Sequence, residues 1–236
     1  MTVYLDNAAT SKIKPKEVFQ AIEKYYHEIN CNPGRGAYEL YLEAGRQIMD
    51  ARERLVSFFG GEKQHEVIFT PNITVALNIA LKGLLEKGDH VLITGLEHNG
   101  VVRPLRALEK ERGITFSVMP GDEQGRIDLF KTERLIKSNT KMIMATHASN
   151  VVGTIIPIQE LGDLAKKHGL DFVVDTAQTA GLLPLNIKEI GATVLAFTGH
   201  KHLLGPMGIG GFCMDKKDAV RLKPLYEGGT GSISDS

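Results

Sequence analysis

The spacing of hydrophobic positions alternates along most of the chain. Between residues 67 and 213, short unbroken apolar runs are separated by segments whose apolar residues recur every three or four positions. Unbroken runs of Val, Ile, Leu and Phe are typical of strands buried on both faces, whereas the periodic segments are typical of amphipathic helices. The alternation therefore predicts an α/β fold with a mainly parallel mixed sheet between two layers of helices, a three-layer αβα sandwich.

The same pattern sets the expected elements. Strands are predicted over residues 67–69, 90–94, 114–118, 142–146, 172–174, 193–197 and 209–213. Helices are predicted over residues 15–29, 40–58, 73–85, 101–112, 128–136, 158–168 and 216–225. Pro15 suits the first turn of its helix, because its fixed φ fits a helix start. Residues 30–36 form a break, and Gly60 and Gly61 end the second helix.

Composition narrows the kind of partner. The chain has 236 residues, enough for one large domain, and its 28 Lys and Arg residues balance its 28 Asp and Glu residues. This balance argues against nucleic acid or an anionic membrane and favours a small-molecule partner. No apolar run approaches the roughly 18 residues that span a bilayer, and the first residues lack a signal-peptide pattern. We therefore expect a soluble, cytoplasmic protein.

The sequence offers little support for a metal or dinucleotide site. Its two cysteines, Cys31 and Cys213, lack the CxxC spacing of a structural zinc site. His200 and His202 would share a face only on a strand, while the neighbouring glycines indicate a loop, so no metal is expected. Residues 208–211 contain closely spaced glycines, but no helix is predicted directly after them, as a dinucleotide-binding fingerprint requires.

Polar side chains follow the predicted strands at the point where each strand ends. Because the carboxyl ends of parallel strands meet at one edge of a sheet, we expect these side chains to lie close together. A helix start after residue 72 would add backbone N–H groups suited to phosphate. The group supplies hydroxyls, imidazoles, acids, amides and one amine: Thr70, Asn72 and Thr74; Glu97 and His98; His147, Ser149 and Asn150; Asp175 and Gln178; Thr198, His200 and Lys201.

Lys201 is the centre of this group. It lies between two apolar runs in a glycine-rich stretch, residues 197–212. Partial burial would disfavour its ammonium form and leave an amine able to condense with a carbonyl. Ordinary alternatives stay open for each residue taken alone: Lys201 in a surface hairpin, Thr70, Asn72 or Asp175 as a helix cap, His98 or His147 as an interior histidine, and Asn150 in a turn.

Several segments carry a resemblance to a known family: residues 4–10, 69–74, 97–99, 147–154, 175–178 and 198–201. They are spread along the chain, so that the resemblance extends over nearly its whole length, and the last two, Asp-x-x-Gln and Thr-x-His-Lys, are the most specific. The chain resembles the class V aminotransferases, in particular the cysteine desulfurase and selenocysteine lyase branch of the pyridoxal-phosphate enzymes. The resemblance implies the large domain of a fold-type I pyridoxal-phosphate enzyme.

The resemblance also implies roles for individual residues. Lys201 would form a Schiff base with pyridoxal phosphate and shuttle protons at the substrate carbon, and His98 would stack on the cofactor ring. Asp175 would pair with the pyridine nitrogen, and Gln178 would donate to the phenolate oxygen. Asn150 would lie by that oxygen or by the substrate carboxylate. The phosphate would be held by Thr74, the backbone at Ile73, Thr198 and His200.

The implied activity is that of a cysteine desulfurase, which converts cysteine to alanine and leaves an enzyme-bound persulfide for transfer to a sulfur-acceptor protein. Selenocysteine lysis, β-elimination and transamination stay open as alternatives, as does a catalytically incomplete protein that binds the cofactor. By resemblance alone we expect a homodimer, with residues 228–231 reaching the partner's site.

The chain also departs from the family. In the desulfurases a C-terminal small domain supplies the nucleophilic cysteine and a carboxylate-binding arginine, and this sequence does not contain it. We therefore expect an N-terminal segment, residues 1–30, and a cofactor-binding large domain, residues 31–236, from either a fragment or a naturally short protein. Cys31 in a loop and Cys213 on a buried strand do not match the family's nucleophile. Ile73 and Val75 stand where many members of the family have more polar residues. The phosphate contact would therefore depend more on backbone N–H groups.

Overall fold

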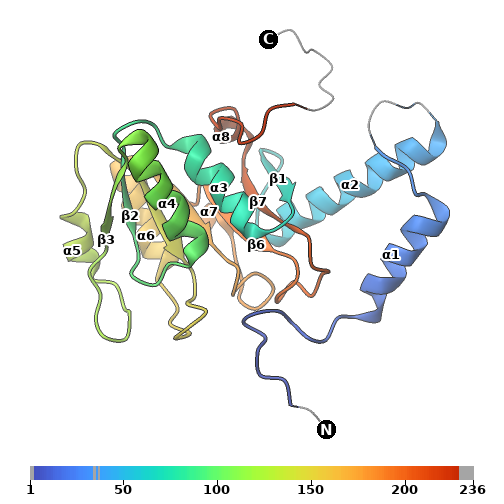
Figure 1. The fold of residues 1–236 in the computed structure, drawn as a ribbon, viewed down its shortest axis with the longest axis horizontal. Helices are drawn as coiled ribbons and strands as arrows, with labels where there is room; N and C mark the ends of the chain where they lie inside the picture. Colours follow the sequence, from blue (N-terminus) through green and yellow to red (C-terminus); the bar gives the residue numbers. More distant parts are fainter. Residues whose placement is uncertain (1–2, 34–35, 37, 229–236) are drawn as a thin grey trace.

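The computed structural model of the protein describes residues 3–33, 36 and 38–228. In these residues the chain forms a seven-stranded sheet in the order β1-β7-β6-β5-β4-β2-β3 (Figure 1). Each predicted strand is present, with ends that differ by a few residues. The strands are β1 (His65–Thr70), β2 (His90–Ile93), β3 (Thr115–Val118), β4 (Thr140–Thr146), β5 (Asp171–Asp175), β6 (Val194–Thr198) and β7 (Gly210–Asp215).

The direction of the strands follows from their connections. β3, β2, β4, β5 and β6 run parallel to one another, whereas β7 runs antiparallel to both β6 and β1. Each parallel step passes through a helix, but β6 and β7 are joined by residues 199–209 alone. That connection is shorter than a parallel crossover needs. The predicted mainly parallel mixed sheet is thus confirmed.

Helices account for the remaining regular structure. They are α1 (Lys16–Glu28), α2 (Glu39–Phe58), α3 (Ile73–Leu84), α4 (Asn99–Arg112), α5 (Leu129–Glu133), α6 (Ile158–His168), α7 (Ile187–Ile190) and α8 (Lys216–Ala219). α5 and α8 are shorter than predicted. α7 was not predicted, because a single turn is too short to show a period. The side chain of Asn186 caps it by accepting from the N–H groups of Lys188 and Glu189.

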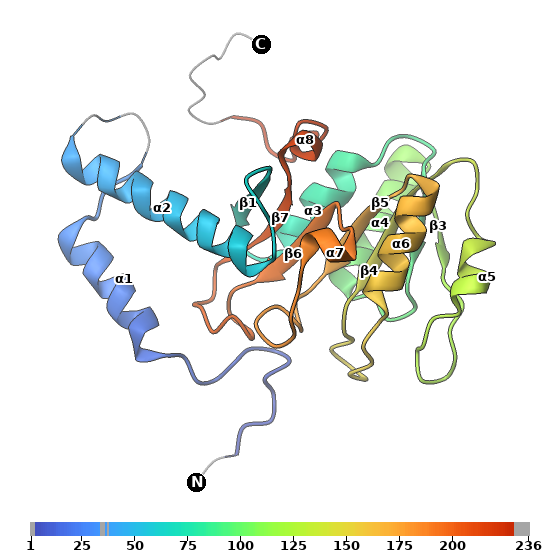
Figure 2. The same cartoon turned by 180° about the vertical axis from the view of Figure 1, so that it is seen from behind.

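The two faces of the sheet are covered by different helices, as the opposite views in Figures 1 and 2 show. α3 and α4 pack on one face, against strand residues such as Val91 and Met142. α6 and α7 pack on the other face, against Leu92 and Ile143, the next residues along the same strands. Successive strand residues therefore point into two separate cores, which confirms the three-layer sandwich.

α1 and α2 extend away from the sandwich in both views. α1 buries none of its residues, and α2 buries only Ala44. The chain reaches the sheet at Phe59, which is fully buried and whose ring centroid lies 5.1 Å from that of Phe197 on β6. The residues before α1 return to the carboxyl edge of the sheet, where Ser11 binds the β6–β7 connection.

Some predicted features lie outside the described residues. They are Met1 and Thr2 at the start, Gly34 and Arg35 of the break, and residues 229–231 of the glycine-rich segment. Within the part of the chain that the structure describes, none of the helices has the length and apolar character that crossing a membrane requires.

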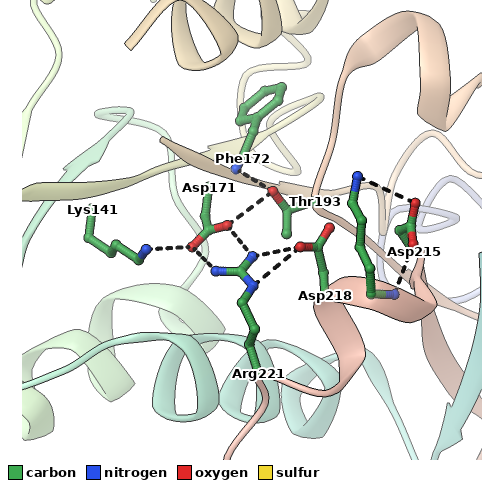
Figure 3. A network of polar contacts seen from close by, with 8 residues as sticks. Lys141, Asp171, Phe172, Thr193, Asp215, Asp218 and Arg221 are labelled. Atoms are coloured by element: carbon green, nitrogen blue, oxygen red, sulfur yellow. Dashed lines mark hydrogen bonds and ion pairs between the residues drawn. The ribbon is translucent and has the colours of Figure 1, made fainter. Parts of the chain in front are cut away.

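An ion-pair network lies at the amino ends of the parallel strands, on the edge of the sheet opposite their carboxyl ends (Figure 3). Asp171, the buried first residue of β5, accepts hydrogen bonds of 2.7 and 3.3 Å from the guanidinium of Arg221. The ammonium of Lys141 lies 3.6 Å from the same carboxylate, and Asp218 on α8 also pairs with Arg221, at 2.9 Å. The network therefore fixes the chain after β7 to the edge of the sheet opposite the carboxyl ends of the parallel strands.

Candidate active site

The carboxyl ends of neighbouring parallel strands bring the predicted polar residues to one edge. β5 ends at Asp175 and β6 ends at Thr198, three residues before Lys201. His98 follows β2 and starts α4. The positive charges of Lys201 and His98 both act on the Asp175 carboxylate, so the three groups share one electrostatic environment. The geometry thus gathers an amine, an acid and an imidazole, as the strand-end pattern predicts.

Lys201 lies in the tight connection between β6 and β7. The Gly199 N–H donates to the Ile209 carbonyl at 2.9 Å, and the Gly205 N–H donates to the Gly199 carbonyl at 2.8 Å. Leu204, which donates to the carbonyl of Lys201, has a φ of 58°, a conformation that costs a residue with a side chain some free energy. The connection is therefore a hairpin, but Lys201 is half-buried in it rather than a surface lysine.

The protonation of Lys201 depends on burial and on one carboxylate. Burial lowers the pKa of Lys201, and the charge of Asp175 opposes this effect. Burial likewise raises the pKa of Asp175, which is only 3 % exposed, while a hydrogen bond from the N–H of Ala177 at 2.8 Å and the positive charges of Lys201 and His98 lower it. The pair therefore offers a partly desolvated amine beside a buried carboxylate.

His98 is the N-cap of α4. Its Nδ1 atom accepts a hydrogen bond of 3.0 Å from the N–H of Gly100. His98 and Thr74 also line a pocket of about 380 Å³ between α3 and α4. The ring is exposed and is therefore available to a ligand at this edge.

The start of α3 and the end of β6 form a cradle for an anion. The side chain of Asn72 accepts from the N–H of Val75 at 3.0 Å, whereas the N–H groups of Ile73 and Thr74 have no partner within the helix. The buried hydroxyl of Thr198 has no hydrogen-bond partner. A buried hydroxyl and free helix N–H groups together suit a phosphate.

Gly210 permits the close packing on which this cradle depends. A Cβ atom at Gly210 would lie 2.9 Å from the backbone nitrogen of Ile73 and 2.8 Å from the carbonyl carbon of Asn72. Because these are backbone atoms, they could not move without displacing the start of α3. β7 and α3 therefore approach each other closely only because residue 210 has no side chain.

The segment before α1 lies over the Lys201 connection, a placement that was not predicted. The Ser11 N–H donates to the carbonyl of His200 at 3.2 Å, and its hydroxyl donates to the carbonyl of Lys201 at 2.7 Å. Thr10 and Lys14 also bind His200. These contacts join residues about 190 positions apart, so no local pattern could have revealed them.

Glu97 lies at the predicted edge, although no role could be assigned to it from the sequence. Its Oε1 atom accepts from the Thr94 hydroxyl at 2.6 Å and from the Thr146 N–H at 2.8 Å, which ties the ends of β2 and β4 together. Its Oε2 atom is buried without a hydrogen-bond partner. Burial, assisted by the nearby charge of Asp175, raises the pKa of Glu97 to about 8 despite these hydrogen bonds. The acid is therefore mainly protonated at neutral pH.

Other predicted residues lie at the edge with different contacts. Asn150 is exposed in the turn after β4. The amide of Gln178 donates to the carbonyl of Ala8 at 3.0 Å, which leaves its second N–H for another acceptor. His147 is buried, and its Nδ1 atom lies 2.9 Å from the hydroxyl of Thr179, the arrangement of an interior histidine.

The two cysteines lie in different environments, and that of Cys213 is unsuited to a nucleophile. Cys213 is buried on β7, where burial, assisted by the charge of Glu66, raises the pKa of its thiol to about 12. Cys31 is half-buried in the loop after α1, with its sulfur 2.8 Å from the hydroxyl of Tyr38. In the described ranges, no group of three or more His, Cys, Asp or Glu side chains is placed to hold a metal ion.

Comparison with known proteins places this geometry in a family. Residues 3–234 match the family model described as aminotransferase class-V. A probable cysteine desulfurase from Methanothermobacter thermautotrophicus is 38% identical over 99% of this chain and 58% of its own length. A probable cysteine desulfurase from Pyrococcus abyssi is 36% identical over 99% of this chain and 58% of its own length. The chain therefore spans about three-fifths of the length of these curated relatives.

Solved structures agree with the family match. The apo structure of a cysteine desulfurase from Thermococcus onnurineus NA1 superposes with a TM-score of 0.91 at 36% identity, over 99% of this chain and 58% of that one. The structure described as SspA in complex with cysteine superposes with a TM-score of 0.88 at 29% identity, over 97% of this chain and 65% of that one. The chain belongs to the class-V aminotransferase family, whose fold its seven-stranded mixed sheet adopts.

Proposed function

We propose that this chain is the pyridoxal-phosphate-binding large domain of a cysteine desulfurase, which converts cysteine to alanine and retains the sulfur as a persulfide. The observation that carries the proposal is the placement of Lys201, a half-buried amine, in the field of Asp175, a buried carboxylate. The names of the relatives support this activity, and a structural neighbour solved with cysteine supports cysteine as the substrate.

The residues fit a ring that carries a phosphate and a basic nitrogen. The unpartnered hydroxyl of Thr198 and the N–H groups of Ile73 and Thr74 would bind phosphate oxygens, and His200 would complete this cradle. Asp175 would accept a hydrogen bond from the ring nitrogen, because a buried carboxylate without a full set of donors favours a cationic N–H partner.

When bound, pyridoxal phosphate supplies a carbonyl that condenses with amines and a ring that accepts electrons from the substrate. Lys201 provides the amine, and its lowered pKa increases the fraction with an unprotonated Nζ at neutral pH. The same Nζ atom would take and return a proton at the substrate carbon. His98 would cover the ring, while Gln178 and Asn150 would donate to its oxygen or to the substrate carboxylate.

Sulfur transfer requires a cysteine thiolate that attacks the substrate sulfur. Cys213 is excluded by its burial, and Cys31 lies in the loop after α1. We therefore place the nucleophile in a small domain beyond the large domain of residues 31–236, with residues 1–30 as an N-terminal segment. A homodimer in the cytoplasm, which passes sulfur to an acceptor protein, completes the proposal. The family leaves selenocysteine lysis, β-elimination and transamination as alternative reactions.

A second candidate function is a cofactor-binding protein without turnover. The burial of Cys213 favours it, because a buried thiol with a raised pKa is a poor acceptor for the substrate sulfur. This candidate predicts the same cofactor site as the desulfurase but no alanine from cysteine.

Borohydride trapping tests the proposal directly. The chain is incubated with pyridoxal phosphate, reduced, digested and analysed by mass spectrometry, and we expect the label on the Lys201 peptide. Lys201→Ala should lose this label, whereas Lys110→Ala, at an exposed lysine of α4, should keep it. No label on Lys201 would contradict the cofactor site. Alanine formation from cysteine, measured against a serine control, separates the desulfurase from the cofactor-binding protein.

A further inference from the structure

Thr10 contacts the histidine next to Lys201 in two ways. Its hydroxyl oxygen lies 3.0 Å from Nδ1 of His200 and 3.1 Å from the backbone carbonyl oxygen of the same residue. Both residues are half-buried. The contact therefore joins the segment that precedes α1 to the imidazole that the proposed function places at the phosphate.

The single proton of the Thr10 hydroxyl can go to only one of these two acceptors. If it goes to the carbonyl of His200, the Nδ1 atom must donate to the hydroxyl and thus carries the ring proton. If it goes to Nδ1, that atom accepts, and the proton of a neutral ring lies on Nε2. The Thr10 hydroxyl therefore decides which nitrogen of His200 is the donor on the far side of the ring.

The carbonyl of His200 does not depend on Thr10. The N–H of Ser11 donates to it at 3.2 Å, and the ammonium of Lys14 donates to it as well. These two donors match the two lone pairs of a carbonyl oxygen. The Thr10 proton is therefore available to Nδ1.

The ring of His200 carries one proton at neutral pH. Burial lowers its pKa, and the positive charges of Lys201 and Lys14 lower it further. A neutral imidazole has a single N–H group, so the position of that proton matters for an anionic ligand.

We propose that Thr10 is a positioning residue that donates its hydroxyl proton to Nδ1 of His200 and thereby keeps Nε2–H as a donor to the cofactor phosphate. This role rests on the proposed function, in which His200, Thr198 and the start of α3 hold the phosphate. With the opposite tautomer, Nε2 would direct a lone pair at the phosphate oxygens, and the contact would be repulsive.

Two ligands that differ only in the phosphate provide the test. Thr10→Val replaces the hydroxyl by a methyl group of similar size. We expect it to weaken pyridoxal-phosphate binding by about tenfold, the size of one charge-assisted hydrogen bond, and to change pyridoxal binding by less than about twofold. Thr10→Ser keeps the hydroxyl and should restore the affinity. Thr115→Val, at an exposed threonine of β3, is the matched control and should bind both ligands as the wild type does.

The outcome for each ligand separates positioning from general structure. Equal losses for pyridoxal phosphate and pyridoxal would assign Thr10 a merely structural role and overturn the proposal. Unchanged affinity for both ligands would overturn it too. A wild-type chain that shows no trapped label on Lys201 would instead contradict the proposed function.

Nitrogen NMR of the apoprotein measures the tautomer of the His200 ring and requires neither an activity assay nor the cofactor. The His200 ring signals are identified by their loss in His200→Gln, and spectra are recorded with and without inorganic phosphate. We expect the Nε2–H tautomer in the wild type and a mixture of tautomers in Thr10→Val. A predominant Nδ1–H tautomer in the wild type would overturn the proposal even if the valine variant failed to fold.

Discussion

The carboxylate of Asp175 and the amine of Lys201 act on each other across the carboxyl edge of the sheet, and each opposes the effect of burial on the other. Burial lowers the pKa of Lys201 while Asp175 raises it, and burial raises the pKa of Asp175 while Lys201 lowers it. The charge of one group therefore sets the reactivity of the other.

Asp175→Asn removes the charge that raises the pKa of Lys201, so we expect that pKa to fall further. At neutral pH a larger fraction of the Lys201 amine would then be unprotonated and reactive. The pH dependence of Lys201 labelling by an amine reagent, followed by mass spectrometry of the apoprotein, measures this change. Asp163→Asn, at an exposed position of α6, should leave the labelling midpoint unchanged. A midpoint that stays in place or rises in Asp175→Asn would contradict the coupling.

Glu97 should make the fold less stable as the pH rises. Its pKa is raised from 4.5 to about 8 in the folded protein, so the folded state binds its proton more tightly than the unfolded state does. The stabilisation is complete below about pH 4.5 and is lost as the pH rises toward 8. Glu97→Gln removes this dependence, and the Tm of the variant should exceed that of the wild type by at least about 2 °C at pH 8 but not at pH 5. Melting curves with the same difference at both pH values would argue against a protonated Glu97.

His98 combines a helix cap with a position at the cofactor site, and two substitutions separate these roles. Asn keeps an acceptor for the N–H of Gly100, whereas Ala removes it. We expect His98→Ala to lower the free energy of unfolding by about 1 kcal/mol and His98→Asn to lower it by less than about 0.5 kcal/mol. Both should weaken pyridoxal-phosphate binding. Urea unfolding gives the first quantity, and equal losses of stability in the two variants would show that the cap is unimportant.

Arg221 should matter for stability but not for the cofactor site. Arg221→Met leaves the buried carboxylate of Asp171 with Lys141 at 3.6 Å as its remaining cation. We expect a loss of about 2 kcal/mol, below the usual cost of breaking a buried pair, because the arginine side chain is 39% exposed. Arg54→Met, which breaks an exposed pair with Asp50, should cost less than about 0.5 kcal/mol in the same urea titration. Similar losses in the two variants would show that burial of Asp171 adds nothing.

The fold was predictable from the sequence wherever the hydrophobicity of the residues determined the element. Apolar runs marked the central strands β2, β5 and β6, because both faces of a central strand are buried in this architecture. Short elements were not predictable: α7 has four residues, and its cap at Asn186 resembles any loop asparagine in the sequence. α5 and α8 end earlier than the hydrophobic pattern predicts, at Glu133 and Ala219.

The candidate site divides in the same way. Asp175, His98 and Lys201 could be grouped from sequence, because each lies at or just after the carboxyl end of a parallel strand and those strand ends meet at one edge. Thr10 and Ser11 could not be assigned to the site from sequence, since they contact residues that are 190 positions away in the chain. The protonated state of Glu97 arises from its burial between the ends of β2 and β4. That burial cannot be predicted from a polar residue in a loop of the sequence.

The antiparallel direction of β7 has a practical consequence for labelling this protein. β7 carries the chain from the Lys201 connection to the amino edge, where Arg221 anchors it and the N–H of Lys223 donates to the carbonyl of Gly83 at the far end of α3. The six residues of β7 span roughly 20 Å along the strand, from one edge of the sheet to the other. A fluorophore attached near Glu227 would therefore be remote from a ligand at Lys201, whereas one attached near Asp6 would report directly on its arrival.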